Sequence, residues 1–195
     1  TVTKALLTVQ PAALFDKPYG LAIPALGYTI TGAIAGDPNP VYSGVPTISA
    51  NASQFSLPGT YVISSSNGSL AATNYAFDFK TSPLTIAKGK ITFTALSTSK
   101  TYGSANPTFT ASAAGAVAGD PTAPYTGSPI VTSTATASSS VAGSPYPITV
   151  DTSSLVSAKY DFLTVPGELT VNRAPLVVTA ANKTKVEGAA NPVLT

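Results

Sequence analysis

The feature that most constrains this chain is an internal repeat with a period of about 84 residues. The Lys-Pro-Tyr-Gly segment at 17–20 recurs as Lys-Thr-Tyr-Gly at 100–103, an offset of 83 positions. The Ala-Gly-Asp-Pro segment at 35–38 recurs at 118–121 with the same offset. Further matches follow in the same order with offsets that drift only to 85: 42–46 with 125–129, 59–63 with 143–148, 69–75 with 154–160, and 84–86 with 169–171. The chain is therefore expected to contain at least two copies of one small structural unit.

Both ends of the chain fall inside the repeat pattern. Residues 173–178 resemble residues 4–9, and the Thr-Val-Thr at 1–3 resembles the last strand of a unit. We predict four segments: 1–3 as the tail strand of a preceding repeat, 4–87 as complete repeat 1, 88–172 as complete repeat 2, and 173–195 as the start of a truncated repeat 3. On this interpretation the chain is a piece of a longer tandem array.

Composition and local pattern favour β-structure. Apolar residues make up 44% of the chain and charged residues 9%, whereas disordered chains are usually poor in apolar residues and rich in charge. The chain also contains 17 Pro and 15 Gly, which favour turns. We predict strands in the first unit over 23–31, 46–49, 60–64, 75–79 and 84–86. In the second unit we predict strands over 90–96, 108–111, 129–132 and 147–150, then a closing hairpin of 160–165 and 168–171 around Pro166-Gly167.

Six or seven short strands per unit at this spacing are typical of a two-sheet sandwich. The predicted fold class is all-β, with tandem small Ig-like β-sandwich domains arranged in an elongated rod. The alternative is a β-grasp-like domain with one helical turn near the Gly-Asp-Pro motif. The rod follows from the short connections at 86–91 and 171–176, which restrict the angle between units. Pro175 stiffens the second connection, and Gly89 loosens the first.

Several residue types that carry chemistry are missing from the chain. It has no His, Cys, Met or Trp, so the usual general base and the usual thiolate nucleophile are absent. The ligands that zinc, copper and iron prefer are absent with them. We therefore predict that the chain is not an enzyme and has no catalytic residue, cofactor or metal site. The net charge is +2 with scattered basic residues, which gives no footprint for nucleic acid. Apolar runs are too short for a membrane span in this piece.

The Tyr-Gly pair is the first structural motif in each repeat. Tyr19 precedes Gly20, and Tyr102 precedes Gly103 at the equivalent place. A tyrosine at the entry of a strand is expected to pack against its own domain. A role in stacking on a ligand is the alternative for these side chains.

Two further pairs are predicted to hold the fold. Asp37 and Asp120 stand in Gly-Asp-Pro turns, where a short acid can hydrogen-bond its own backbone. Tyr75 and Tyr160 resemble the corner tyrosine of sandwich folds, whose hydroxyl ties a loop to a neighbouring strand. All four residues are interpreted as structural.

The order of these motifs resembles the MBG domain of the YGX type. It runs from Tyr-Gly and Asn-Pro through Gly-Asp and a Thr/Ser-Gly-x-Pro strand to Gly-x-Tyr-x-Ile. Ser-Leu-x-x-x-x-Tyr and Leu-Thr-Val then close the unit. The first unit departs from the pattern, with Leu-Ala-Ile-Pro at 21–24 where the second has Ser-Ala-Asn-Pro at 104–107. The resemblance implies tandem modules of large secreted or surface-attached bacterial proteins, often adhesin-like, with no catalytic residues to transfer.

These observations predict a structural spacer or stalk repeat of a large extracellular bacterial surface adhesin or filament. The alternative is a glycan- or host-surface-binding adhesive module that uses Tyr42 and Tyr125. The expected partners are neighbouring repeats of the same array. Residues 173–195, with unpaired strand edges, are further expected to add a strand to other copies of the chain. The expected location is extracellular, at the cell surface.

Overall fold

The computed structural model describes residues 2–38 and 40–193, and it confirms the all-β prediction. Within those residues every regular element is a strand, and the Gly-Asp-Pro segments form turns without the helical turn of the β-grasp alternative. No helix in the described part of the chain could cross a membrane. The strands of the first domain are β1 (Ala5–Pro11), β2 (Leu14–Pro18), β3 (Tyr28–Thr31), β4 (Thr47–Ala50), β5 (Gly59–Ser66), β6 (Tyr75–Phe79) and β7 (Thr81–Ala87). Those of the second are β8 (Gly89–Ala95), β9 (Thr98–Thr101), β10 (Ala111–Ala114), β11 (Ile130–Ser133), β12 (Tyr146–Asp151), β13 (Tyr160–Val165) and β14 (Gly167–Asn172).

Each domain contains two sheets with the same plan. The first domain has a sheet in the order β3-β1-β6 and a sheet in the order β2-β7-β5-β4. The second has the equivalent orders β10-β8-β13 and β11-β12-β14-β9. The repeat in the sequence is thus a repeat of topology, strand for strand.

The sheets are mixed, because each contains one parallel pair. β1 runs parallel to β6 and β2 parallel to β7, and β8 with β13 and β9 with β14 repeat the arrangement. The other pairs are antiparallel. The two-sheet, all-β architecture predicted for each domain is therefore confirmed, with one parallel pair in each sheet where a purely antiparallel sandwich has none.

The predicted closing hairpin of the second domain is wrong. β13 and β14 belong to different sheets, since β13 pairs with β8 while β14 pairs with β12 and β9. Pro166 alone separates the two strands, whereas the tightest common hairpin loop has about two residues. The chain therefore continues onward and passes from one sheet to the other. In the first domain β6 and β7 do the same through Lys80.

Two other strand predictions need correction. The strand predicted over 108–111 is displaced to Ala111–Ala114, and the long strand predicted over 23–31 forms only over Tyr28–Thr31. β2 and β9 were not predicted as strands, because neither segment alternates apolar and polar residues cleanly. Both nevertheless form the parallel edge of a sheet.

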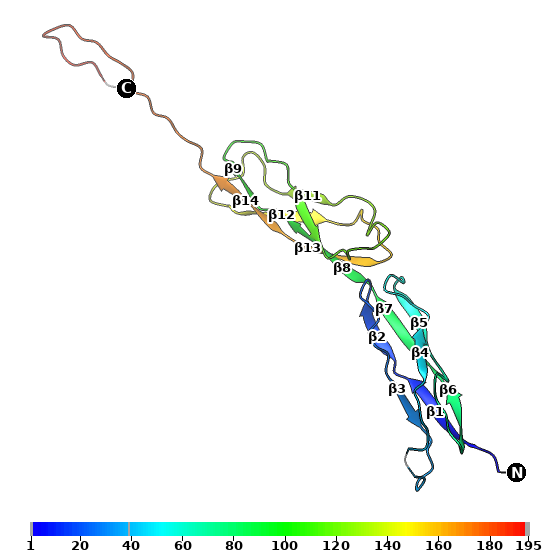
Figure 1. Ribbon diagram of the computed structural model, residues 1–195. Helices are drawn as coiled ribbons and strands as arrows, with labels where there is room; N and C mark the ends of the chain where they lie inside the picture. The colour runs from blue at the N-terminus through cyan, green and yellow to red at the C-terminus, as the bar shows by residue number, and fades with distance from the viewer. Residues whose placement is uncertain (1, 39, 194–195) are drawn as a thin grey trace.

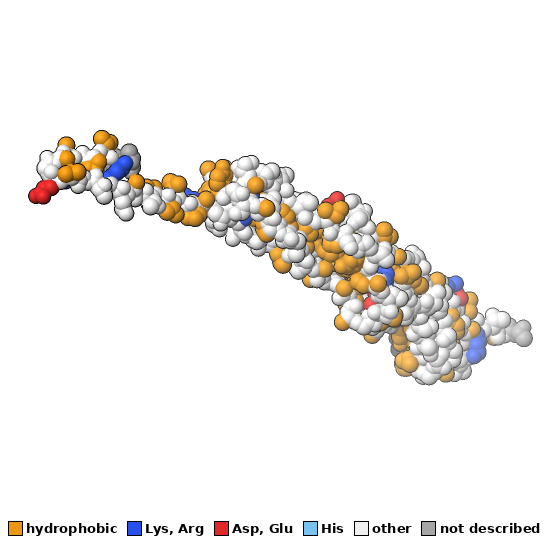
Figure 2. All heavy atoms as spheres, turned by 90° about the horizontal axis from the view of Figure 1, so that it is seen from above, with side chains coloured by type: hydrophobic (Ala, Val, Ile, Leu, Met, Phe, Trp, Pro, Cys, Tyr) orange, Lys and Arg blue, Asp and Glu red, His pale blue; other side chains and the backbone are white. Residues whose placement is uncertain are grey.

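Apolar packing runs through both domains and continues from one to the other. Leu7, Val9 and Ile63 are fully buried in the first domain, and Phe93 and Ile148 are fully buried in the second. The core cluster of the second domain extends into the first, where Tyr19 and Ile86 belong to it. The result is an elongated molecule with the domains end to end (Figure 1), and hydrophobic side chains gather around the middle of its length (Figure 2).

The segment after β14 carries no strand in the described residues. Residues 173–193 extend away from the second domain (Figure 1), and nearly all are exposed. Leu176, Val177 and Val178 are more than four-fifths exposed.

Candidate functional site: the junction between the domains

The two domains are joined by a single residue. β7 ends at Ala87 and β8 begins at Gly89, so only Lys88 lies between them. Lys88 forms an exposed ion pair with Asp161 at 3.3 Å between Nζ and Oδ1. A connection this short leaves little freedom, and side chains on both sides of it determine the angle between the domains.

The first domain presents a turn made by Tyr19 and Gly20 at the end of β2. The Tyr19 amide donates to the Ala87 carbonyl at 2.9 Å. The Gly20 amide donates to the Gln54 carbonyl at 3.2 Å, and the Gln54 side-chain amide donates back to the Gly20 carbonyl at 2.7 Å. The turn is therefore fixed to β7 and to the loop after β4 before it meets the second domain. We call it the donor turn.

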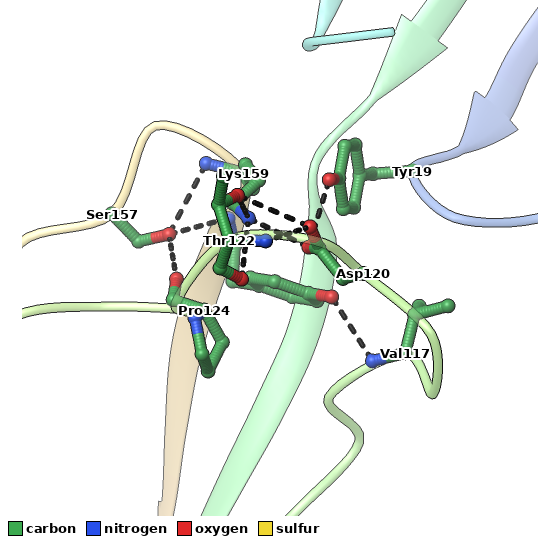
Figure 3. Close-up of polar contacts among 8 residues, drawn as sticks. Tyr19, Val117, Asp120, Thr122, Pro124, Ser157 and Lys159 are labelled. Atoms are coloured by element: carbon green, nitrogen blue, oxygen red, sulfur yellow. Dashed lines mark hydrogen bonds and ion pairs between the residues drawn. The ribbon is translucent and has the colours of Figure 1, made fainter. Parts of the chain in front are cut away.

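The Tyr19 ring is inserted against the second domain. Only 3% of the side chain is exposed. The ring meets Tyr160 edge to face with centroids 5.4 Å apart, and Phe55 of its own domain covers it at 6.4 Å. Its hydroxyl donates a hydrogen bond of 2.8 Å to Oδ2 of Asp120 (Figure 3). Tyr19 thus combines apolar burial with a hydrogen bond to a charged acceptor, which is roughly twice as strong as a neutral one.

Asp120 is the centre of a buried polar network. Lys159 Nζ lies 2.6 Å from its Oδ2. The Lys159 side chain is only 8% exposed and the Asp120 side chain only 6%. Thr122 donates from its amide and its hydroxyl to Oδ1, each at 3.1 Å. Lys159 Nζ also reaches the Thr122 hydroxyl at 2.5 Å and lies 5.5 Å from the centroid of the Tyr19 ring. The carboxylate and the ammonium group therefore have several partners each, as a buried ion pair requires.

The pKa values follow from this geometry. Burial alone would raise the pKa of Asp120, but hydrogen bonds from Lys159, Thr122 and Tyr19 outweigh it and hold that pKa at about 2. Burial and the hydrogen bond to Asp120 both raise the pKa of Tyr19. Burial opposes the charge of Lys159, but Asp120 more than offsets this and raises its pKa. Near neutral pH the junction therefore holds a carboxylate, an ammonium group and a neutral phenol.

The backbone around the network is fixed from behind. The Ser157 hydroxyl donates to the Pro124 carbonyl at 2.7 Å and accepts from the amides of Lys159 and Tyr160, both at 3.1 Å (Figure 3). The Tyr160 hydroxyl accepts the Val117 amide at 3.0 Å. These bonds hold the two loops that receive the donor turn, and we call the surface formed by Val117, Asp120, Lys159 and Tyr160 the acceptor face.

The fit at the junction is tight enough to require glycine at position 20. A Cβ added at Gly20 would lie 2.2 Å from Cγ2 of Val117, and Gly20 has a φ of 82°. A Cβ at Gly89 would lie 2.8 Å from the Tyr160 ring. A side chain at Gly20 would push the domains apart, whereas one at Gly89 would disturb the pairing of β8 with β13 inside the second domain.

Comparison with protein families agrees with the repeat. A family model described as MBG domain (YGX type) matches the chain twice, over residues 7–85 and 91–170. The chain belongs to the MBG domain family. No curated protein sequence matches the chain significantly.

The two MBG domains place their other motif residues in equivalent positions. Tyr75 is buried, and its hydroxyl accepts the Ile34 amide at 3.0 Å and donates to Asp37. Tyr102 and Gly103 form the same turn as Tyr19 and Gly20, but Tyr102 is 47% exposed. The structure thus brings Tyr19, Asp120 and Tyr160 together and leaves Asp37, Tyr75 and Tyr102 outside the junction.

Neither tyrosine predicted for surface binding stands free. Tyr42 and Tyr125 are half-buried. Tyr42 packs edge to face on Phe77 at 6.5 Å, and Tyr125 packs on Phe93 and Phe162 at 5.5 and 5.7 Å. Their rings are engaged in the packing of each MBG domain.

Sequence reasoning missed the residues that complete the junction. Lys159, Thr122 and Phe55 were not identified as site residues, although each packs or bonds at the interface. The available signal was a departure from the repeat, because Lys159 stands where the first MBG domain has Asn74. In residues 2–38 and 40–193, no group of three acidic side chains could hold a metal ion.

Proposed function

We propose that this pair of MBG domains is a rigid, non-catalytic spacer within a large extracellular bacterial surface protein, an adhesin or a filament. The observation that carries the proposal is the interlocked junction. Tyr19 is buried against Asp120 and Tyr160 across a link of one residue. Two domains that only needed a tether would not need a desolvated ion pair at their boundary.

The network fixes direction as well as contact. A hydrogen bond and an edge-to-face ring contact depend on angle, so rotation of one domain about Lys88 breaks both. The strand direction also continues from β7 into β8 (Figure 1). A series of such units keeps its length under thermal motion, which is the property a stalk needs.

Two chemical features support the non-catalytic, extracellular part of the proposal. The titratable side chains of the junction are paired with one another and buried, so they are not presented to a substrate. The low charged fraction and the absence of cysteine fit a secreted repeat module of the MBG type. The proposed partners are the neighbouring repeats of the same array.

Small-angle X-ray scattering of the dilute chain tests the spacer proposal. We expect the scattering of a straight two-domain rod, and we expect Tyr19→Ala to introduce a hinge that shortens the average end-to-end dimension. Tyr102→Ala is the matched control, since it removes the equivalent tyrosine outside the junction. A wild-type chain that already scatters as a flexible pair, unchanged by Tyr19→Ala, would refute a rigid spacer.

A further inference from the structure

The strands by which the chain enters and leaves a domain run parallel to each other. In the second domain the chain enters through β8 and continues into β9, while β13 continues into β14 and leads the chain out (Figure 1). β8 pairs in parallel with β13, and β9 pairs in parallel with β14. We propose that these two pairs make the second domain a mechanical clamp, which resists tension along the length of the molecule. This role rests on the spacer function proposed above, since it states the load that the spacer carries.

Tension along the chain loads the two parallel pairs in shear. Lys88 precedes β8 beside the first domain, and Arg173 follows β14 at the far end of the second domain (Figure 1). A pull on these two residues drags β8 and β9 in one direction and β13 and β14 in the opposite direction. The hydrogen bonds of a parallel pair are evenly spaced along it, so sliding has to break them together. A pull that separates the strands sideways breaks them one after another from one end.

The pairing and the core packing of the second domain oppose the same sliding motion. The register of β8 with β13 has no shift, and neither has the register of β9 with β14. Buried side chains alternate along the strands that take the load, with Ile91 and Phe93 on β8 and Leu169 and Val171 on β14. A slip of one residue in a paired strand moves its buried side chains to the opposite face of the sheet. Sliding therefore costs core packing as well as hydrogen bonds.

The first domain has the same two parallel pairs, but one of them is interrupted. Between Leu14 and Lys17 the register of β2 with β7 shifts, so two residues of β2 lie opposite one residue of β7. Asp16 in this bulge has a φ of 56°, and its amide donates to the Thr85 hydroxyl at 2.9 Å. A bulge disrupts the hydrogen-bond ladder locally, whereas the equivalent pair of β9 with β14 is regular. We therefore expect the first domain to unfold at a lower force than the second.

Pulling on the full chain with optical tweezers tests the clamp. The chain has no cysteine, so a pair of introduced cysteines defines the direction of the pull. Lys88→Cys with Arg173→Cys loads the second domain in shear. Leu96→Cys with Val165→Cys is the matched control, because these exposed residues lie at the same end of the β8–β13 pair and a pull on them separates the strands sideways. Forced unfolding follows the unfolding rate, and at one pulling speed we expect an unfolding force several times higher in shear.

The first domain supplies the second comparison. Thr3→Cys with Lys88→Cys loads it in shear, and it should unfold at a lower force than the second domain loaded in the same way. Deletion of Asp16 removes the extra residue of the bulge and should raise this force towards that of the second domain. Thermal unfolding of each variant without load shows that the cysteine pairs leave the stability of the domains unchanged.

Two results would overturn the clamp. Equal unfolding forces for the two cysteine pairs of the second domain would mean that its resistance does not depend on direction. A first domain that resists shear as strongly as the second would mean that an unbroken ladder gives no advantage. The spacer proposal is judged separately by scattering: a straight molecule without direction-dependent unfolding refutes only the clamp, and a flexible molecule refutes the rigid spacer whatever the force.

Discussion

Tyr19 and Tyr102 occupy the same turn in two domains of one fold, yet one is 3% exposed and the other 47%. Their backbone hydrogen bonds are equivalent, and each is followed by a glycine with a φ above 80°. The fold of a single MBG domain therefore positions this tyrosine but does not bury it. Burial comes from the next domain, so the Tyr-Gly turn belongs to the connection between modules.

The loops that contain Asp120 and Asp37 give the complementary comparison. Asp120 and Asp37 stand in the same loop, but Asp120 has Lys159 at 2.6 Å while the equivalent neighbour of Asp37 is the uncharged Asn74. A single carboxylate in a buried interface is unfavourable unless a cation pairs with it, and Lys159 supplies that cation to Asp120. The loop of the second domain at the junction therefore carries a buried ion pair that the loop of the first domain lacks.

The largest expected effect comes from Lys159→Met. This change keeps the length of the side chain but leaves Asp120 without its cation in a buried site, which should cost about 3–5 kcal/mol. Hydrogen exchange of β8 and β13 amides measures the loss in the second domain. Asn74→Met at the equivalent exposed position is the control and should stay within about 0.5 kcal/mol. Equal effects of the two changes would remove the distinction between the two loops.

Gly20→Ala against Gly103→Ala is the next test. Both changes place a side chain at positive φ, which costs roughly 1–2 kcal/mol. Only the Gly20 change adds a clash with Val117, and overpacking costs about 1–3 kcal/mol more. Thermal unfolding followed by circular dichroism should therefore show the larger loss for Gly20→Ala. Equal losses of stability in Gly20→Ala and Gly103→Ala would mean that separating the two domains costs no free energy.

The sequence was sufficient for most of the strands, though not for β2 and β9, and it was not sufficient for their pairing. Matches such as 35–38 with 118–121 predicted the repeat, and β6 and β8 were predicted nearly to the residue, because tyrosine and alternating apolar residues mark them. The hairpin at Pro166 was predicted wrongly, since strand spacing alone does not say which sheet a strand joins. One residue between two strands was the physical clue against it.

The junction was beyond sequence reasoning for a related reason. Tyr19 and Asp120 were both interpreted as structural residues of their own domains, and their contact spans 101 positions. In the repeat, Tyr19 and Asp120 belong to different motifs in different units. They come together only because the first domain packs against the second in one particular orientation. Lys159 gave a weak signal because it departs from the repeat. The spacing of residues along the sequence does not show that Asp120 is its partner.

Acid titration of Asp120 is the test with the smallest expected effect. Its pKa is about 2 in the folded chain against an ordinary value of 3.8. Since the folded pKa is the lower one, the stabilisation is fully present above about pH 4 and is lost as the pH falls through 2. The shift corresponds to about 2 kcal/mol.

Carbon NMR of the Asp120 carboxyl group measures this pKa directly. Tyr19→Ala and Lys159→Met should each move it towards 3.8, because each removes a donor to the carboxylate. Tyr102→Ala, the matched change on the equivalent turn of the second domain, should leave it in place. If the three variants titrate alike, Asp120 is held by its own loop through Thr122, and the contrast between the two turns has no electrostatic part.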